Sequence, residues 1–236
     1  MDKRDTFIYI DQMNNSIKKV LVTGASNGIG LDLTKKLLAE GAEVIAITRS
    51  GKVADYIHPK LTVFQADINN AESINKVAQQ IEAAGIRIDV LVNNAGVGLD
   101  LGDELPTADL MNATFATNTT GTVLFTEALL NSLNNGGQIV FLSTAMALLR
   151  NAAPNAPAYR MSKAAINMYA VMLSQRLAER KIRVTPLHPG WVQTRMGGDT
   201  APVTIEKSVN GIFKAITENK QTGKFWNIEL DGLEEY

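Results

Sequence analysis

Short apolar runs alternate with longer amphipathic stretches along most of the chain, starting near residue 19. The run at 20–22 contains β-branched residues and ends in a glycine-rich turn, a pattern typical of a buried strand. The stretch 31–40 then carries leucines at helical spacing and ends at Gly41, a frequent helix terminator. The same alternation predicts six further strands, over residues 43–47, 61–64, 90–92, 138–142, 183–187 and 225–228.

Helical patterns fill the intervals between these runs. Strands that alternate with helices of ten or more residues indicate a parallel sheet covered by helices on both faces. We therefore expect an α/β fold, a single doubly wound Rossmann-type domain over residues 17–236 with a seven-stranded parallel sheet. The other predicted helices cover residues 72–84, 108–133, 158–180 and 204–217, and a turn is predicted over 134–137.

The first 16 residues precede this pattern. They are expected to form a flexible N-terminal tail, in which the short apolar run 7–10 could add an edge strand. Met13 is an alternative start, because the regular pattern begins just after it. The run is too short for the core of a signal peptide.

Composition narrows the function classes. The 236 residues are 45% hydrophobic and 20% charged, which suits one globular domain with a sizeable core. The net charge of −1 does not indicate a nucleic-acid or anionic-membrane surface. No cysteine is present, and the two histidines, His58 and His188, are far apart, so no disulfide or zinc site is expected. No apolar run is long enough to span a bilayer, and we expect a soluble cytoplasmic protein.

The glycine-rich turn after the first strand has the spacing of a dinucleotide-binding site. Gly24 would allow the tight turn, Gly28 would let the backbone approach a pyrophosphate, and Gly30 would let the helix lie close to the strand. The helix that follows would offer unpaired N–H groups to the phosphates. A structural loop of another α/β protein is the alternative interpretation.

The residues after the second strand bear on the choice of cofactor. An acidic side chain there would bind the adenosine ribose hydroxyls and favour NAD(H). The chain instead has Thr48-Arg49-Ser50, and an arginine can pair with a 2′-phosphate. NADP(H) is therefore favoured, NAD(H) stays possible, and a solvated Arg49 is the alternative.

Tyr159 and Lys163 lie four positions apart in a predicted helix, so they share one face. A phenol has a pKa near ~10, and a nearby ammonium would lower it toward neutral pH. Tyr-x-x-x-Lys also arises by accident, with a half-buried tyrosine and a solvated lysine. The two are more informative beside the other polar positions that follow predicted strands, because the carboxyl ends of parallel strands meet in one crevice. Those positions are 23–30, 48–49, Asp67, Asn94, Thr144 and 188–189.

These motifs together resemble the short-chain dehydrogenase/reductase family over nearly all of residues 18–230. They are Thr-Gly-x-x-x-Gly-x-Gly at 23–30, Asp67, Asn-Asn-Ala-Gly at 93–96, Asn118, Tyr159-x-x-x-Lys163, and Pro189-Gly190 followed by Thr194. The segments 158–165 and 187–198, with the chain end at 223–232, are similar to the branch that contains sniffer-type carbonyl reductases and bacterial C-factor proteins.

The resemblance implies roles for individual residues. Tyr159 would exchange a proton with a substrate oxygen, Lys163 would lower its pKa and bind the nicotinamide ribose, and Asn118 would hold a water of the proton relay. Asp67 would contact the adenine. The implied cofactor-binding residues are Gly24, Ser26, Asn27, Gly28, Ile29, Gly30, Arg49, Asp67, Ile68, Asn94, Ala95, Gly96, Tyr159, Lys163, Pro189, Gly190, Val192 and Thr194.

Two departures from the family pattern concern the substrate side. The family places a catalytic serine second in a pair after the fifth strand, and here that position holds Thr144, after Ser143. Successive strand residues face opposite sides, so only one hydroxyl can serve, and we expect Thr144. Arg195 stands where this branch often has an acidic residue, so the substrate entrance would be more cationic.

The predicted function is NADP(H)-dependent reduction of an aldehyde or ketone, or the reverse oxidation, by a homodimer or homotetramer. The helices at 108–133 and 158–180 are the expected interface. One alternative is a dinucleotide-binding signalling protein of C-factor type with incidental catalysis. A third candidate, a nucleotide-sugar isomerase or dehydratase, would need a larger substrate domain than the chain leaves after its seventh strand.

Overall fold

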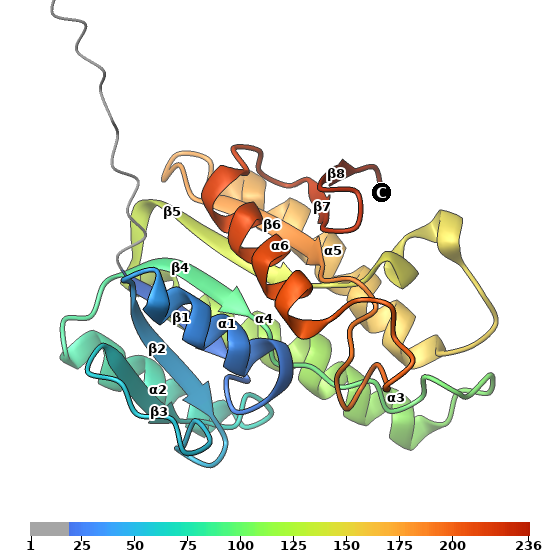
Figure 1. Ribbon diagram of the computed structural model, residues 1–236, viewed down its shortest axis with the longest axis horizontal. Coiled ribbons are helices and arrows are strands. Elements are labelled where there is room, and N and C mark those ends of the chain that lie inside the picture. The colour runs from blue at the N-terminus through green and yellow to red at the C-terminus, as the bar shows by residue number, and fades with distance from the viewer. Residues whose placement is uncertain (1–18) are drawn as a thin grey trace, which may run out of the picture.

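A single eight-stranded sheet organises the molecule, which a computed structural model describes from residue 19 to 236 (Figure 1). The strand order is β3-β2-β1-β4-β5-β6-β7-β8, and the first seven strands are parallel. The expected α/β fold with seven parallel strands is therefore confirmed. These strands are β1 Lys19–Thr23, β2 Glu43–Thr48, β3 Leu61–Gln65, β4 Ile88–Asn93, β5 Leu133–Leu142, β6 Arg183–His188 and β7 Phe225–Asn227.

The expected strand number is one too low. The eighth strand, β8 (Gly232–Glu234), pairs antiparallel with β7 at the sheet edge. The chain reverses between them at Asp231, whose φ of 51° lies in the left-handed region. Lys214 stabilises this turn by pairing with the Asp231 carboxylate at 2.5 Å.

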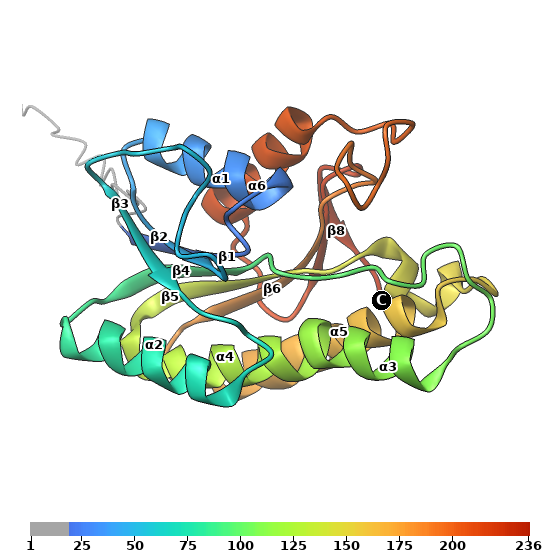
Figure 2. The ribbon, with the colours of Figure 1, turned by 90° about the horizontal axis from the view of Figure 1, so that it is seen from below.

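Helices cover both faces of the sheet. Figure 2 shows α1 (Gly28–Ala39) and α6 (Ile205–Glu218) on one face, and α2 (Ala71–Ala83), α4 (Thr122–Leu129) and α5 (Pro157–Arg176) on the other. The remaining helical segments are α3 (Ala108–Phe115), the π-helix η1 (Ala116–Gly121) and the 3₁₀ turns η2 (Leu130–Ser132), η3 (Ala145–Ala147) and η4 (Leu149–Asn151). None of the helices from residue 19 onward combines the length and the apolar character needed to cross a bilayer.

The alternation of side chains along each strand divides the core into two layers. Val20 and Val22 of β1 pack with Leu33 and Leu37 of α1, whereas Leu21 between them belongs to the opposite layer. That second layer holds apolar side chains of α2, α4 and α5, among them Ile74, Phe125 and Ile166. Both faces of the central strands are thus buried, which explains their continuous apolar runs.

The predicted helix 108–133 is interrupted. The helical segments α3, η1 and α4 follow one another without a break, but the middle segment, η1, is a π-helix that contains Asn118. A Cβ atom on Gly121 would come within 2.2 Å of the Ile68 carbonyl oxygen, so only glycine fits this close approach. The π-helical turn that contains Asn118 therefore packs directly against the backbone at Ile68.

The turn predicted over 134–137 lies inside a strand. β5 begins at Leu133, which pairs with Ile88, and the register shifts before Gln138 pairs with Val90. Gly136, with φ of 77°, lies in this bulge. The glycines thus mark a bulge, and the strand starts earlier than expected. The expected N-terminal tail at 1–16, with its possible edge strand and alternative start, lies outside the described residues.

Candidate active site

The strand order reverses at β1, which pairs with β2 on one side and β4 on the other. Ligands of doubly wound sheets bind beside such a reversal, at the carboxyl ends of the strands. The glycine turn follows β1 and the segment 93–96 follows β4, so the structure brings both to this position.

The glycine turn has backbone conformations that side chains rarely adopt. Gly24 and Gly28 have φ values of 67° and 51°. A Cβ atom on Gly30 would lie 2.4 Å from both the Asn94 Nδ2 atom and the Gly24 carbonyl oxygen. The Asn94 side chain donates hydrogen bonds to the carbonyl oxygens of Thr23 and Gly24, at 2.8 and 3.1 Å. Asn94 therefore holds the turn itself in shape.

Helix α1 begins at the end of this turn with free donors. Asn27 is its N-cap and makes no side-chain cap bond, and the first turn holds no acidic residue. The N–H groups of this helix end are therefore available to an anion, which fits the pyrophosphate of a dinucleotide. Ser26 and Ile29 flank the same turn and are partly exposed.

The segment after β6 reaches back to the glycine turn. Thr194 Cγ2 would lie 3.5 Å from a Cβ atom on Gly28, so the two chain segments adjoin. Gly190 has φ of 83°, the Pro189 carbonyl accepts a hydrogen bond from Ser208 Oγ at 2.7 Å, and Val192 is buried. This segment thus lies next to the glycine turn, where the pyrophosphate is predicted to bind.

Other predicted cofactor residues differ in their surroundings. Arg49 is exposed just after β2, and its carbonyl accepts a hydrogen bond from Gln65 Nε2 at 2.9 Å. The Asp67 carboxylate accepts the Asn69 N–H at 2.9 Å. The Ile68 side chain lies in the core below the sheet, so only its backbone could face a cofactor. Ala95 also packs against that core, and its N–H donates to Thr23 Oγ1.

Tyr159 and Lys163 are both buried on α5. Burial raises the pKa of the Tyr159 phenol to about 12, and the neighbouring Thr144 side chain acts on this pKa in the opposite direction. Burial lowers the pKa of Lys163 to about 8. Lys163 was expected to lower the pKa of Tyr159, but in the chain alone the pKa of Tyr159 is raised, because desolvation is the largest effect on both groups. Lys163 Nζ instead donates a hydrogen bond to the Leu142 carbonyl at 2.7 Å.

The hydroxyls of Ser143 and Thr144 have different partners. Ser143 Oγ donates to Asn167 Oδ1 at 2.6 Å in the buried interior. Thr144 lies near Tyr159, and its Oγ1 accepts the Met146 N–H at 3.2 Å. Of the two, Thr144 is the hydroxyl that neighbours the phenol.

Asn118 is held on several sides. Its Oδ1 accepts the Val97 N–H, and its Nδ2 donates to the Val97 carbonyl, both at 2.8 Å, and to Ser162 Oγ at 3.1 Å. A Cβ atom on Gly96 would lie 3.2 Å from Asn118 Oδ1 and 3.3 Å from Lys163 Nζ. The side-chain amide of Asn118 is thus fully used in hydrogen bonds to the protein. A water of the proton relay would have to bind the backbone of Asn118 instead.

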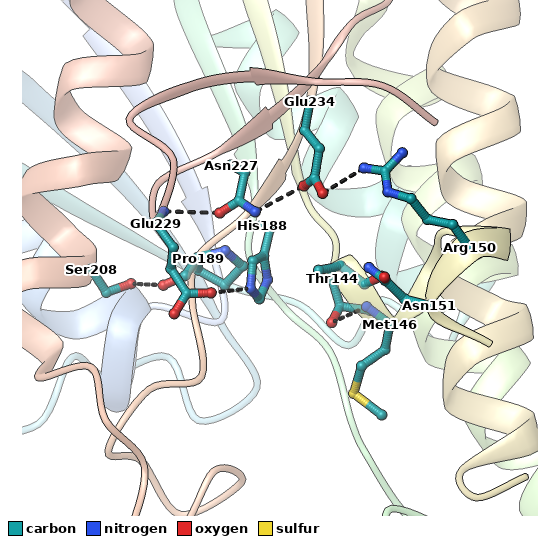
Figure 3. Close-up of polar contacts among 11 residues, drawn as sticks. Thr144, Met146, Arg150, Asn151, His188, Pro189, Ser208, Asn227, Glu229 and Glu234 are labelled. Carbon is teal, nitrogen blue, oxygen red and sulfur yellow. Dashed lines mark hydrogen bonds and ion pairs between the residues drawn. The ribbon is translucent and has the colours of Figure 1, made fainter. Parts of the chain in front are cut away.

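A chain of polar contacts borders Thr144 on the side of the β7–β8 hairpin (Figure 3). Arg150 pairs with the Glu234 carboxylate at 2.5 Å, and Asn227 Nδ2 donates to the same carboxylate at 2.8 Å. Asn227 Oδ1 accepts the Glu229 N–H, and the Glu229 carboxylate contacts His188 Nε2, both at 2.9 Å. Pattern reading missed this chain because its members come from four separate segments.

Comparisons with known proteins agree with this arrangement. The model of the family described as short chain dehydrogenase matches residues 18–203. An uncharacterised oxidoreductase of Methylorubrum extorquens is 34% identical over 203 residues, 83% of this chain and 81% of the relative. The C-signal protein of Myxococcus xanthus is 39% identical over 150 residues, 60% of this chain and 89% of that protein.

Two solved structures have the same fold. The carbonyl reductase Sniffer of D. melanogaster has a TM-score of 0.86 at 27% identity, covering 93% of this chain and 99% of that one. An NADPH-bound carbonyl reductase from chicken fatty liver has a TM-score of 0.84 at 29% identity, with the same coverage.

Proposed function

This chain belongs to the short-chain dehydrogenase/reductase family, and on that premise we propose that it reduces an aldehyde or ketone to the alcohol with NADPH. The observation that carries the proposal is that the Thr144 side chain neighbours the Tyr159 phenol, with Lys163 buried one turn further along the same helix. Bound NADPH supplies the hydride, which the carbonyl carbon receives.

The side chains divide the remaining work. Thr144 donates a hydrogen bond to the carbonyl oxygen, and Tyr159 transfers its phenolic proton to that oxygen as the new C–H bond forms, which yields the neutral alcohol. With a pKa of about 12, the phenol is protonated at neutral pH, as the reducing direction requires. Lys163, charged below a pKa of about 8, stabilises the phenolate that remains until a proton returns from solvent.

NADP(H) is the proposed cofactor. The glycine turn and the free helix end fit a pyrophosphate, and the exposed Arg49 guanidinium fits a 2′-phosphate. The carbonyl reductase from chicken fatty liver binds NADPH, which is consistent with this choice.

The test is oxidation of NADPH by the purified protein in the presence of aldehydes and ketones of graded size. Tyr159→Phe should abolish turnover and weaken NADPH binding far less, because the ring and the other cofactor-binding residues stay and only the phenolic hydroxyl is removed. Tyr169→Phe is the matched control on the same helix, since its hydroxyl bonds Glu127. Turnover by Tyr159→Phe at the wild-type rate would exclude the mechanism.

The 39% identity to C-signal supports a second candidate, a dinucleotide-binding signalling protein. In that case NADPH would bind, and no carbonyl compound would be turned over. We also propose a homodimer or homotetramer built on α4 and α5, which carry exposed apolar side chains.

A further inference from the structure

The helix that carries Tyr159 and Lys163 has no cap of its own. Its N-cap residue is Ala156, which has a φ of 57° and no side chain able to accept a hydrogen bond. Pro157 lacks an N–H group, and the Arg160 N–H already bonds to the Ala156 carbonyl at 3.0 Å. The first turn of α5 therefore leaves two backbone donors, Ala158 and Tyr159.

Asp100 accepts both of these donors from a distant part of the chain. Its Oδ2 receives the Ala158 N–H at 2.6 Å, and its two carboxylate oxygens lie 3.2 and 3.4 Å from the Tyr159 nitrogen. The Asp100 side chain is only 1% exposed. A buried carboxylate at a helix N-terminus makes charge-assisted bonds and complements the helix dipole.

The loop that carries Asp100 is fixed at further points. The Asp103 carbonyl accepts the Ala156 N–H at 2.8 Å, and the Leu101 carbonyl accepts from Asn155 Nδ2 at 3.3 Å. At its start, the loop is bound through Val97 to Asn118. The loop after β4 and the start of α5 therefore form one connected unit.

We infer that Asp100 is a positioning residue. By binding the backbone N–H of Tyr159, it fixes the position of the tyrosine relative to Thr144. The inference rests on the proposed function, because it assigns Tyr159 the proton transfer. A displacement of about 1 Å at a reacting group can reduce the rate by about a hundredfold, so a shift of the first helical turn acts on turnover. The glycine turn, where the pyrophosphate is proposed to bind, lies between β1 and α1, so loss of this bond should affect NADPH binding much less than turnover.

The experiment compares Asp100→Ala and Asp100→Asn with a control variant, Thr107→Ala. The control removes a different helix cap, the hydrogen bond from the Leu110 N–H to Thr107 Oγ1 at the start of α3. Asp100→Ala should lower kcat by about tenfold or more, with the dissociation constant of NADPH changed by less than about twofold. Asp100→Asn keeps one acceptor oxygen and should recover most of the loss. Thr107→Ala should keep the wild-type kcat.

Amide hydrogen exchange provides a readout besides activity. The Ala158 and Tyr159 amides should exchange faster in Asp100→Ala and keep their protection in Asp100→Asn and Thr107→Ala. If the wild type turns over no carbonyl compound, the proposed function fails, and exchange alone then decides whether Asp100 holds this turn. The inference is overturned if these amides stay protected in Asp100→Ala, or if its kcat matches that of Thr107→Ala.

Discussion

Ser143 donates its hydroxyl hydrogen to Oδ1 of Asn167 at 2.6 Å, and both side chains are buried. The hydroxyl of the serine that precedes Thr144 is thus bound to Asn167 of α5 within the interior. This contact separates a structural hydroxyl from the one proposed to act on substrate.

Thr144→Ala should lower kcat by about 10²–10³-fold, the typical effect of removing a donor from a developing oxyanion. Ser143→Ala should keep kcat near the wild-type value but reduce the free energy of unfolding by about 1–3 kcal/mol, because the Asn167 acceptor loses its partner. Steady-state kinetics and denaturant titration of both variants measure these effects. The opposite pattern would assign the catalytic role to Ser143.

Arg49→Gln should raise the dissociation constant of NADPH by about tenfold to a hundredfold, because a charge-assisted bond to the 2′-phosphate is lost. The dissociation constant of NADH should stay the same. Fluorescence titration with both cofactors measures this difference, with Lys52→Gln, another exposed cation three residues on, as the control. An equal weakening of NADPH and NADH would show that Arg49 does not read the 2′-phosphate.

The pH dependence of reduction should report Lys163. Its burial lowers the pKa to about 8, so kcat/KM for NADPH, which reflects the free enzyme, should be level below pH 8 and fall above it. The pKa of Tyr159, about 12, lies beyond this range, so the phenol stays protonated throughout. Any turnover that remains in Lys163→Arg should lack this decline, because arginine stays charged. A decline of unchanged position in that variant would contradict the assignment.

His188 should make stability depend on pH. Burial lowers its pKa below the ordinary value of 6.5, although Glu229 and Glu234 oppose the shift. As pH falls below 6.5, the unfolded chain binds a proton that the folded one excludes, so the free energy of unfolding decreases down to the folded pKa. The lowered pKa of Glu234 acts only below 4.5, in a separate range.

Denaturant titrations between pH 5 and 7.5 measure this slope. His188→Asn should remove it, and His58→Gln, at a partly exposed position, is the matched control and should retain it. A slope that persists in His188→Asn would assign the pH dependence to other groups.

The assembly prediction concerns Met168 and Met172, which are 63% and 60% exposed one turn apart on α5. Replacing either methionine by glutamate should shift the protein toward the monomer in light-scattering measurements, because burying a charge in an apolar interface is costly. Leu230→Glu, at an equally exposed apolar position, is the control. An unchanged mass in all three variants would place the interface elsewhere.

The sheet could be predicted because its central strands are covered on both faces. Leu21 and Val22 face opposite layers and are both apolar, so the strand shows as a continuous run. Strand β8 gives no such signal, since it has three residues and its Leu233 is 46% exposed. The glycines at 136–137 indicated a turn, whereas pairing of Leu133 with Ile88 continues the strand across them.

Some residues of the candidate site could likewise be predicted from local sequence patterns, and others could not. Tyr159 and Lys163 could be recognised because helical spacing of four residues places them on one face. Asp100 could not, because its bonds to α5 join residues 58 and 59 positions apart, and the local cap position holds an alanine. The hydrogen bonds of the Asn118 side chain could not be predicted either, since they depend on a π-helical turn that no local sequence pattern indicates.

The hydrogen bond from Lys163 Nζ to the Leu142 carbonyl has a mechanical consequence. Leu142 is the last residue of β5, two positions before Thr144, while Lys163 shares α5 with Tyr159. The ammonium thus joins the helix that carries the phenol to the strand end that carries the threonine. Because sliding of α5 over the sheet would stretch this bond, the bond opposes changes in the separation of the Tyr159 and Thr144 hydroxyls.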